Sequence, residues 1–267
     1  MSEATTTDLL AGRTLVIAGV GPGLGGRIAR AAVGHGAAVM MGARSSAFGG
    51  GLAAELVDAG ARAAFRECDV TDDGSCRALV TDAVSSFGSV DTVVANAMSG
   101  AGSGTEVESA DFDEWSQAFD VNLFGALRIA RAAFDELRSS PNGSVVFIGS
   151  QIVRRVFPGR GAYAASKAAL LAAAQVLASE VGGEGIRVNT VVPGRMWGPP
   201  LQAALPRLAS ERGRTEADEL DSWVDATALG RLVTDEEVAR TVVFLASDLA
   251  AAVTGQTVDV NGGETMS

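Results

Sequence analysis

The sequence contains few of the side chains that build metal sites and disulfide frameworks. His35 is its only histidine, and Cys68 and Cys76 are its only cysteines. The spacing of the two cysteines matches no zinc motif, and a single pair makes no disulfide framework. We therefore expect two reduced, buried or half-buried thiols, a cytoplasmic location and no dependence on a metal.

Basic residues are also scarce. The chain has 21 lysines and arginines against 32 aspartates and glutamates, a net charge of -11. Such a chain repels polyanions, so nucleic acid is not an expected partner. Residues 1–11 lack the basic and apolar segments of a secretory signal and are predicted to be a flexible tail. The alanine-rich run 162–178 contains Lys167 and Gln175 and falls short of a membrane span, so no membrane partner is expected.

Aromatic residues make up only 5% of the 267-residue chain, whereas 33 residues are glycine. This balance suits tight turns, and the length suits one domain. Apolar runs of strand length alternate with helical patterns, which indicates an α/β fold: a single Rossmann-like domain over residues 12–267, with a doubly wound parallel sheet flanked by helices. The seven expected strands are residues 14–19, 37–42, 62–68, 91–96, 144–149, 186–192 and 257–260. The expected helices begin near Gly25, Leu52, Asp72, Asp111, Gly161 and Asp235.

One long connection departs from this alternation. Residues 193–227 include Pro199, Pro200 and Pro206 around a polar, charged middle, and the stretch is longer than ordinary connections between a strand and a helix. We predict an irregular lid here that sets substrate specificity.

A glycine-rich turn, residues 18–26, follows the first expected strand and opens the first expected helix. Backbone N–H groups and the helix dipole can hold a pyrophosphate at such a point. The glycines allow three registers: Gly21, Gly23 and Gly26; Gly19, Gly23 and Gly25; or Gly19, Gly21 and Gly23, which is similar to a methyltransferase turn. On its own the motif also fits glycines that only permit a tight turn.

Arg44 lies at the end of the second expected strand, where NAD-binding proteins place an acidic residue. A carboxylate there would repel a 2′-phosphate, whereas a guanidinium can pair with one or stack on adenine. The position therefore favours NADP, although an arginine here is also compatible with an ordinary solvated side chain.

Tyr163 and Lys167 are four residues apart at the start of an expected helix, which puts them on one face about 6 Å apart along its axis. A nearby ammonium group favours the phenolate, so the tyrosine could act as a general acid or base nearer neutral pH. Ser150 follows the fifth expected strand, at the sheet edge where ligands of open α/β folds bind. Taken singly, each side chain has an ordinary structural explanation.

The chain resembles the short-chain dehydrogenase/reductase family over about residues 13–263. The glycine turn is similar to the family's T-G-x-x-x-G-x-G motif with Ala18 in the threonine place, which selects the register Gly19, Gly23 and Gly25. The resemblance implies a strand order of 3-2-1-4-5-6-7. It also implies pairing through residues 111–138 and 161–181 into a homodimer or homotetramer.

Further motifs of the family follow in order. Asn122 matches its active-site asparagine, Ser150 its serine, and Tyr163 with Lys167 its Y-x-x-x-K motif, so these four residues are implied to be catalytic. The other residues implied to contact the cofactor lie in the glycine turn, at the ends of strands and in the loop after the sixth strand. The full implied cofactor set is Gly19, Gly23, Leu24, Gly25, Arg44, Asp69, Val70, Asn96, Ala97, Tyr163, Lys167, Pro193, Gly194 and Met196.

Two segments depart from the family pattern. Residues 95–98, A-N-A-M, stand where the family has N-N-A-G, so the first asparagine and the glycine are replaced. In the loop that begins at Pro193, Gly198 stands where a cofactor-binding threonine is often found. The second departure puts the contacts between this loop and the nicotinamide amide in doubt.

The resemblance implies hydride transfer between nicotinamide and a secondary alcohol or ketone. In the reductive direction Ser150 would bind the carbonyl oxygen and Tyr163 would donate the proton. Lys167 would bind the nicotinamide ribose and lower the pKa of Tyr163, while Asn122 would help hold a water that reprotonates Lys167.

The substrate is a small molecule, and we predict NADPH-dependent reduction of a medium-sized apolar or aromatic ketone. Alternatives are oxidation of an alcohol with NAD, or a non-catalytic nucleotide sensor. The candidate substrate residues are Met98, Gln151, Phe157, Trp197 and Leu201, with Met196, Leu205 and Trp223 also in the lid. These apolar side chains would equally serve to pack the lid onto the domain. Arg154 and Arg155 are interpreted as surface charges rather than contacts for an acidic substrate.

Overall fold

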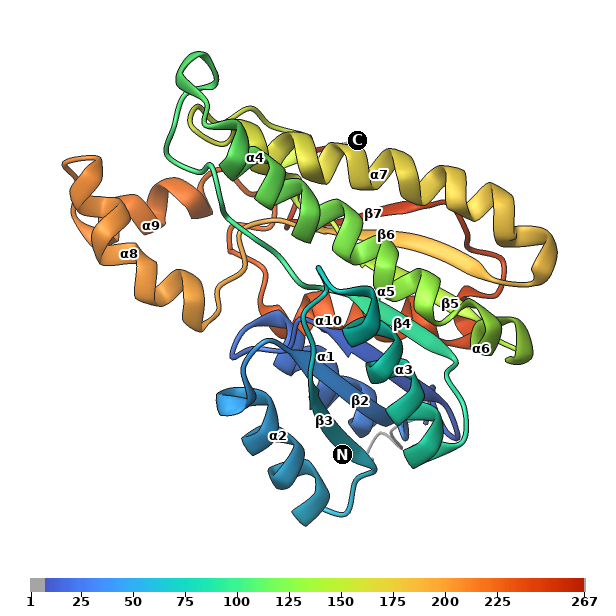
Figure 1. Ribbon diagram of the computed structural model, residues 1–267. Coiled ribbons are helices and arrows are strands. Elements are labelled where there is room, and N and C mark those ends of the chain that lie inside the picture. The colour runs from blue at the N-terminus through green and yellow to red at the C-terminus, as the bar shows by residue number, and fades with distance from the viewer. Residues whose placement is uncertain (1–7, 267) are drawn as a thin grey trace.

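Seven parallel strands form one sheet in the order β3-β2-β1-β4-β5-β6-β7 in the computed structural model, which describes residues 8–266 (Figure 1). The predicted fold class and strand order are confirmed. The strands are β1 (Thr14–Ala18), β2 (Ala38–Ala43), β3 (Ala63–Glu67), β4 (Thr92–Ala95), β5 (Ser144–Ile148), β6 (Arg187–Pro193) and β7 (Thr257–Val260).

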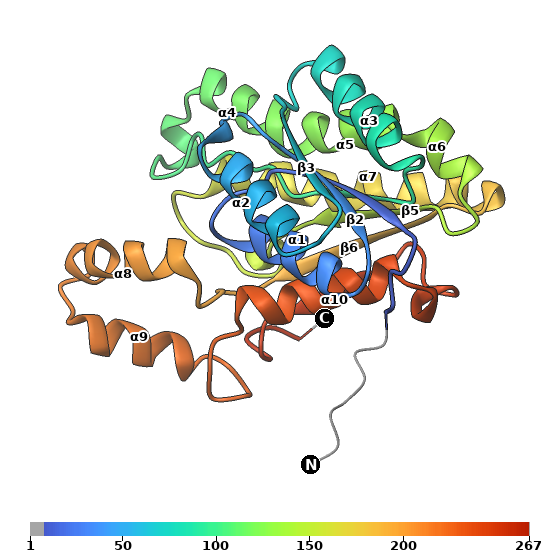
Figure 2. The same ribbon diagram turned by 90° about the horizontal axis from the view of Figure 1, so that it is seen from below.

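Two layers of helices cover the sheet, as Figures 1 and 2 show. The helices α1 (Leu24–Gly34), α2 (Ser46–Asp58) and α10 (Asp235–Ala246) contribute to the core on one face. The helices α3 (Asp73–Phe87), α5 (Ala126–Ala132) and α7 (Gly161–Val181) contribute to the core on the other face, with α4 (Phe112–Phe119) and α6 (Phe134–Ser139) beside them. This arrangement is the doubly wound fold.

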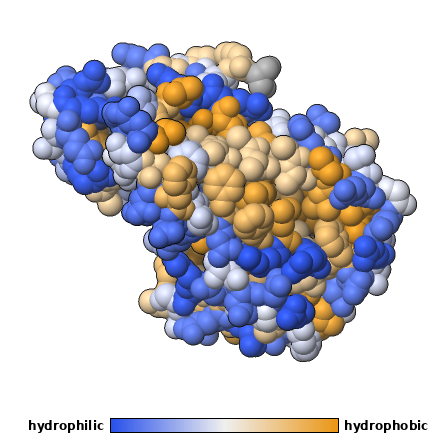
Figure 3. Space-filling view, turned by 45° about the horizontal axis from the view of Figure 1, so that its top comes forward, coloured by the Kyte–Doolittle hydropathy of each residue, from blue (hydrophilic) through white to orange (hydrophobic). Residues whose placement is uncertain are grey.

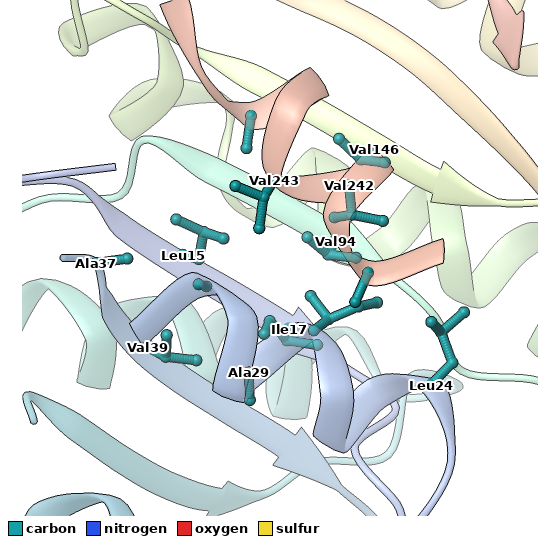
Figure 4. Close-up of a cluster of buried hydrophobic side chains, with 14 of the residues drawn as sticks. Leu15, Ile17, Leu24, Ala29, Ala37, Val39, Val94, Val146, Val242 and Val243 are labelled. Atoms are coloured by element: carbon teal, nitrogen blue, oxygen red, sulfur yellow. The ribbon is translucent and has the colours of Figure 1, made fainter. Parts of the chain in front are cut away.

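The strands divide their apolar side chains between the two cores. Leu15 and Ile17 of β1 point into the first core, where they lie among side chains of α1 and α10 (Figure 4). Val16 and Ala18 point into the second core. Because successive side chains of a strand alternate between faces, a central strand buried on both sides must be apolar throughout.

The helix α2 begins earlier than the predicted start near Leu52. Ser45 caps it, since its Oγ accepts a hydrogen bond from the N–H of Ala47, and the helix runs from Ser46 through three consecutive glycines. Gly49 is needed for packing, because a Cβ atom there would overlap the ring of Phe65. The absence of a side chain at Gly49 thus allows α2 to lie close to β3.

The predicted irregular lid, residues 193–227, contains two helices instead. They are α8 (Pro199–Glu211) and α9 (Glu216–Val224), which project beyond one end of the sheet in Figures 1 and 2. The first two prolines occupy the first helical turn, where a missing N–H breaks no hydrogen bond. The two helices enclose a small core of their own, built on Leu205, Trp223 and Leu232.

Two predictions about the ends and helices of the chain need correction. The expected tail, residues 1–11, reaches into the first core at Leu10, which is fully buried, while residues 1–7 lie outside the described part. The run 162–178 was expected to fall short of a membrane span, yet the helical segment Gly161–Glu184 is long and apolar enough to cross one by length and composition. In the fold this helix covers one face of the sheet, because Leu170 and Ala174 pack into the core on that face.

Candidate active site

The glycine turn between β1 and α1 leaves no room for side chains at three positions. Gly19 has a φ of +100°, and a Cβ atom there would overlap the backbone of Ala97. A Cβ atom at Gly25 would overlap the carbonyl oxygen of Gly19, and one at Gly26 would overlap that of Gly21. Packing therefore requires Gly19 and Gly25 of the family register, and it requires Gly26 but not Gly21 of the alternative register, because a Cβ atom at Gly21 would meet no described atom within 4 Å.

Asn96, at the end of β4, ties this turn to the neighbouring strand. Its Nδ2 donates a hydrogen bond of 2.6 Å to the carbonyl oxygen of Gly19. The same Nδ2 would lie 2.9 Å from a Cβ atom at Gly25. The asparagine that remains of the family's N-N-A-G segment thus holds the backbone of the phosphate-binding turn in place.

A cavity of about 420 Å³ opens beside the turn, at the carboxyl ends of the central strands. Arg44 and Asp69 lie in its wall, and both are exposed. The Asp69 carboxylate accepts hydrogen bonds from the N–H and the hydroxyl of Thr71, which lower its pKa. Other predicted cofactor residues share this wall, namely Gly19, Val70, Asn96 and Ala97, together with the candidate substrate residue Met98. The glycine cradle and the cavity suit the adenosine half of a dinucleotide.

Ser150 and Tyr163 meet beyond the end of β5. Ser150 caps a short 3-10 turn, since its Oγ accepts a hydrogen bond from the N–H of Ile152, and Tyr163 lies in the first turn of α7. Burial raises the pKa of the Tyr163 phenol, while its hydrogen bond with Ser150 and the positive charge of Arg160 act in the opposite direction. The predicted serine and tyrosine are therefore brought together.

Lys167 lies one helical turn after Tyr163 and is almost completely buried. Its Nζ donates a hydrogen bond of 2.7 Å to the carbonyl oxygen of Ile148, the last residue of β5. Burial lowers the lysine pKa to about 8. The ammonium was expected to lower the pKa of Tyr163, but burial of the phenol raises that pKa, and the groups that oppose the rise are Ser150 and Arg160, not Lys167.

Asn122 lies in a π-helical turn, Asp120–Gly125, that joins α4 to α5. Its side chain is fully buried and bonds across to two serines. Nδ2 donates to the carbonyl oxygen of Ser99 and to Oγ of Ser166, each at 3.0 Å, while Oδ1 accepts from the N–H of Ser99 at 2.7 Å. Both amide hydrogens are thus in use, so any water at this residue is held by its oxygens.

Ser166 connects this asparagine to the tyrosine turn, and sequence reasoning missed it. Its hydroxyl donates a 2.9 Å hydrogen bond to the carbonyl oxygen of Tyr163 and accepts from Asn122. Ser166 is completely buried. The signal was available, because a serine three residues after Tyr163 lies on the same helical face.

The loop after β6 brings Pro193 and Gly194 to the same end of the sheet. A Cβ atom at Gly194 would lie 2.7 Å from that of Asn261 and 3.3 Å from Oε1 of Gln151. Gln151 is buried beside this loop, and its Oε1 has no hydrogen-bond partner among the described residues, so its predicted contact with a substrate stays a prediction. Met196 pairs with Val233 in an isolated bridge.

The other candidate substrate residues are engaged in packing. The ring of Phe157 lies 5.5 Å from the guanidinium carbons of both Arg155 and Arg195. Trp197 and Leu201 pack against the small core of the lid. The packing interpretation thus accounts for both lid residues.

The two arginines after the catalytic serine candidate each have an acidic partner. Arg154 forms an ion pair with Asp259, and Arg155 forms one with Glu264. Glu264 also pairs with Arg195. These ion pairs are compatible with the interpretation of Arg154 and Arg155 as surface charges.

Fold and site define an α/β oxidoreductase, and comparison with known proteins identifies its family. Residues 19–265 match a family model described as enoyl-(acyl carrier protein) reductase. The chain is 30% identical to 3-oxoacyl-(acyl-carrier-protein) reductase FabG of Chlamydia muridarum, over 96% of this chain and 98% of that protein. It is 33% identical to cis-4-hydroxycyclohexanecarboxylate dehydrogenase of Sinomonas cyclohexanicum, over 97% and 98% of the two chains.

A solved structure leads to the same family. A double mutant of a short-chain dehydrogenase/reductase from Serratia marcescens superimposes with a TM-score of 0.83 at 27% identity, over 97% of this chain and all of that chain. The protein belongs to the short-chain dehydrogenase/reductase family and is an oxidoreductase. The cofactor of the family is NAD or NADP.

Proposed function

We propose that this enzyme uses NADPH to reduce a ketone on a medium-sized apolar, cyclic or aromatic molecule to a secondary alcohol. The observation that carries the reaction class is the grouping of Ser150, Tyr163 and Lys167 beyond the carboxyl end of β5. The glycine turn and its cavity suit a dinucleotide, and the bound nicotinamide supplies the hydride.

The protein's own groups handle the proton and the carbonyl oxygen. The hydroxyls of Ser150 and Tyr163 both hydrogen-bond that oxygen, and Tyr163 donates its proton to the alkoxide as it forms. Because burial keeps the phenol protonated, Tyr163 can act as a general acid and donate the proton that reduction of a ketone requires. Lys167, released from Ile148, donates to ribose hydroxyls and stabilises the tyrosinate left behind.

The preference for NADPH rests on Arg44. It follows β2 in the wall of the cavity, at the position where NAD-binding proteins carry an acidic residue. The carboxylate of Asp69, in the same wall, already accepts two hydrogen bonds from Thr71. A guanidinium can form two hydrogen bonds to a 2′-phosphate.

Replacing Arg44 with aspartate is expected to reverse the cofactor preference. The new carboxylate repels the 2′-phosphate and accepts hydrogen bonds from the ribose hydroxyls of NADH, so the ratio of kcat/KM for NADPH to that for NADH should fall about 100-fold or more. Steady-state kinetics at a fixed ketone concentration measure the ratio. A wild-type enzyme that prefers NADH would contradict the proposed role of Arg44 and favour oxidation of an alcohol with NAD.

The substrate class is proposed from the surroundings of the site and from relatives. Met98 is exposed at the rim of the cofactor cavity, and Trp197 and Leu201 belong to the lid beside the loop after β6. A related protein is named for a hydroxycyclohexanecarboxylate. Assays of NADPH oxidation with cyclic, aromatic and short linear ketones test the proposal. Cofactor binding without turnover of any ketone or alcohol would favour a nucleotide sensor.

We also propose that two copies pair through α4 and α7. Figure 3, which brings this side of the molecule forward, shows a broad hydrophobic area. Phe112 of α4 is 73% exposed and Val176 of α7 is 58% exposed, and Ala172 lies exposed between the buried positions of α7. Exposed apolar patches of this kind mark protein interfaces, and small side chains let two helices approach closely.

Ala172→Glu is expected to separate the copies, because it would bury a carboxylate at the centre of the paired helices. Sedimentation velocity should show a dimer or tetramer for the wild-type protein and a smaller species for the variant. Gln175→Glu adds the same charge one turn of α7 away at a position that is already polar, and serves as the matched control. A wild-type protein that sediments as a monomer at micromolar concentration would contradict the pairing.

A further inference from the structure

Three helices begin at one point beside the glycine turn. Gly23 is the N-cap of α1, Gly198 is the N-cap of α8, and Asp235 is the first residue of α10. The side chain of Asp235 lies between the other two. Its Oδ2 would be 3.7 Å from a Cβ atom at Gly23, and its carboxyl group would overlap one at Gly198. The positive ends of three helix dipoles therefore converge on this carboxyl group.

The Asp235 carboxyl group is buried and only partly satisfied. The residue is 4% exposed, and Oδ2 finds no hydrogen-bond partner among residues 8–266. A buried polar atom without a partner is costly and points to a missing ligand or water. The carboxyl group lies in the wall of a hollow of about 450 Å³, which Arg27, Gln202 and Glu236 also line.

The charged groups around Asp235 do not neutralise it. Arg27 of α1 is exposed and acts on it through charge alone, and Glu236 adds a second negative charge in the same wall. The next carboxylate, Glu237, is already paired with Arg231. Burial raises the pKa of Asp235, and the charge of Arg27 opposes this rise.

Asp235 explains why residue 198 is glycine. The backbone at Gly198 has a φ of -131°, which any residue adopts, so its conformation does not require glycine. A side chain is excluded only because the Asp235 carboxyl group fills its space. The family often has a threonine at this position, and here a carboxyl group from another helix fills the space that its side chain would need.

The diphosphate of a dinucleotide binds at the start of α1, so it needs the same helix ends that surround Asp235. An ionised carboxylate there would repel the phosphates, whereas a protonated one can donate a hydrogen bond to them. We propose that Asp235 is a cofactor-binding residue, which as a neutral acid donates a hydrogen bond to the diphosphate. This inference rests on the dinucleotide of the proposed function.

The role requires that the bound cofactor keep a proton on Asp235. The dissociation constant of NADH, measured by fluorescence between pH 6 and pH 9, should therefore rise with pH by up to about tenfold per pH unit in the range where free Asp235 is ionised. Asp235→Asn keeps the shape and supplies an N–H donor without a proton to lose. The NADH dissociation constant of this variant should not show the rise with pH that ionisation of Asp235 causes. At pH 8 it should be at least about tenfold lower than that of the wild-type protein. Glu236→Gln, in the same hollow, is the matched control and should keep the wild-type slope.

Proton uptake on binding provides a readout independent of affinity. Calorimetry in buffers of different ionisation enthalpy should show uptake with NADH near pH 7, where Lys167, with its pKa of about 8, is already mostly protonated. Asp235→Asn should abolish it. NADH is the probe because the 2′-phosphate of NADPH itself titrates near pH 6. ADP-ribose, which keeps the diphosphate but lacks nicotinamide, should show the same uptake.

A double substitution at residues 198 and 235 tests whether a hydroxyl at residue 198 can replace the Asp235 carboxyl group in NADH binding. Gly198→Thr alone should weaken NADH binding, because the new side chain collides with Asp235. Gly198→Thr combined with Asp235→Ala restores space and a hydroxyl, so it should bind NADH at least as tightly as Asp235→Ala with glycine retained. The rescued variant should also show no proton uptake.

Two outcomes would overturn the role of Asp235. One is that the NADH dissociation constant depends on pH equally, and proton uptake is equal, in the wild-type protein and in Asp235→Asn. The other is that proton uptake appears with NADH and not with ADP-ribose. Failure of the proposed function looks different, because a protein that binds neither NADH nor NADPH at any pH contradicts dinucleotide binding itself.

Discussion

Tyr163→Phe is expected to reduce kcat for ketone reduction by about 1,000-fold or more, since positioned general acids contribute about 100- to 10,000-fold. The substitution removes one hydroxyl from the only tyrosine of the chain and leaves the ring in place. The hydroxyl bonds to Ser150 and holds a proton that burial keeps on the oxygen. Stopped-flow measurement of NADPH oxidation under single-turnover conditions isolates this loss from product release.

The affinity for cofactor separates a chemical role of Tyr163 from a structural one. The dissociation constant for NADPH should change by less than about fivefold, because the lost hydroxyl is assigned to the substrate oxygen. Ser166→Ala removes a neighbouring hydroxyl that contacts Asn122 and the backbone, and it should cost far less turnover. Retention of wild-type kcat by Tyr163→Phe would disprove the assignment of the general acid.

Lys167→Met is expected to damage both chemistry and cofactor binding. The methionine fills the buried space, but it provides no donor for ribose hydroxyls and no charge to stabilise the tyrosinate. We expect a fall in kcat of about 100-fold or more and a rise of about tenfold in the dissociation constant for NADPH. The melting temperature should not fall, because burial disfavours the charged lysine in the folded protein.

The pH profile tests the same lysine with a definite sign. Its pKa in the free enzyme, about 8, lies below the ordinary value of 10.5, so the ammonium is present below pH 8 and is lost as the pH rises through that value. In ketone reduction, kcat/KM for NADPH, which reports the free enzyme, should therefore decline above about pH 8. The decline should persist in Asp235→Asn, which separates it from titration of Asp235, and disappear in Lys167→Met. A flat profile in the wild-type enzyme would contradict this role of Lys167.

The sheet could be predicted because its strands are buried on both faces. After a first polar residue the strands β1 and β5 are apolar at every position, and the alternation of such runs with helices is visible without any structure. The start of α2 could not be predicted, because three consecutive glycines disfavour a helix, and the contact with Phe65 that requires glycine at position 49 is seen only in the structure. The lid helices were hidden for a related reason, since prolines disfavour helices except in the first turn.

Within the site, sequence spacing indicated which residues meet but not their electrostatics. A spacing of four positions between Tyr163 and Lys167 suffices to place them on one helical face. The directions in which their pKa values shift depend on burial, and the hydrogen bond from Lys167 to Ile148 depends on the packing of α7 against β5; no spacing reveals either. An acidic residue at the start of α10 is ordinary in a sequence, because acids suit helix N-termini. The importance of Asp235 emerges only when Gly198 and Gly23 are found beside it.

The lid has a core that is separate from the two cores of the sheet. Leu205, Trp223 and Leu232 pack against each other and against neighbouring lid residues, while the cofactor turn is held by contacts such as that between Asn96 and Gly19. The two parts meet at the start of α8, where Pro200 lies close to Gly23 of the cofactor turn. Replacement of α9 side chains can therefore alter the proposed substrate side of the enzyme while leaving the dinucleotide side intact. Such a division makes the protein a suitable starting point for directed evolution, with random substitutions confined to α9 (Glu216–Val224).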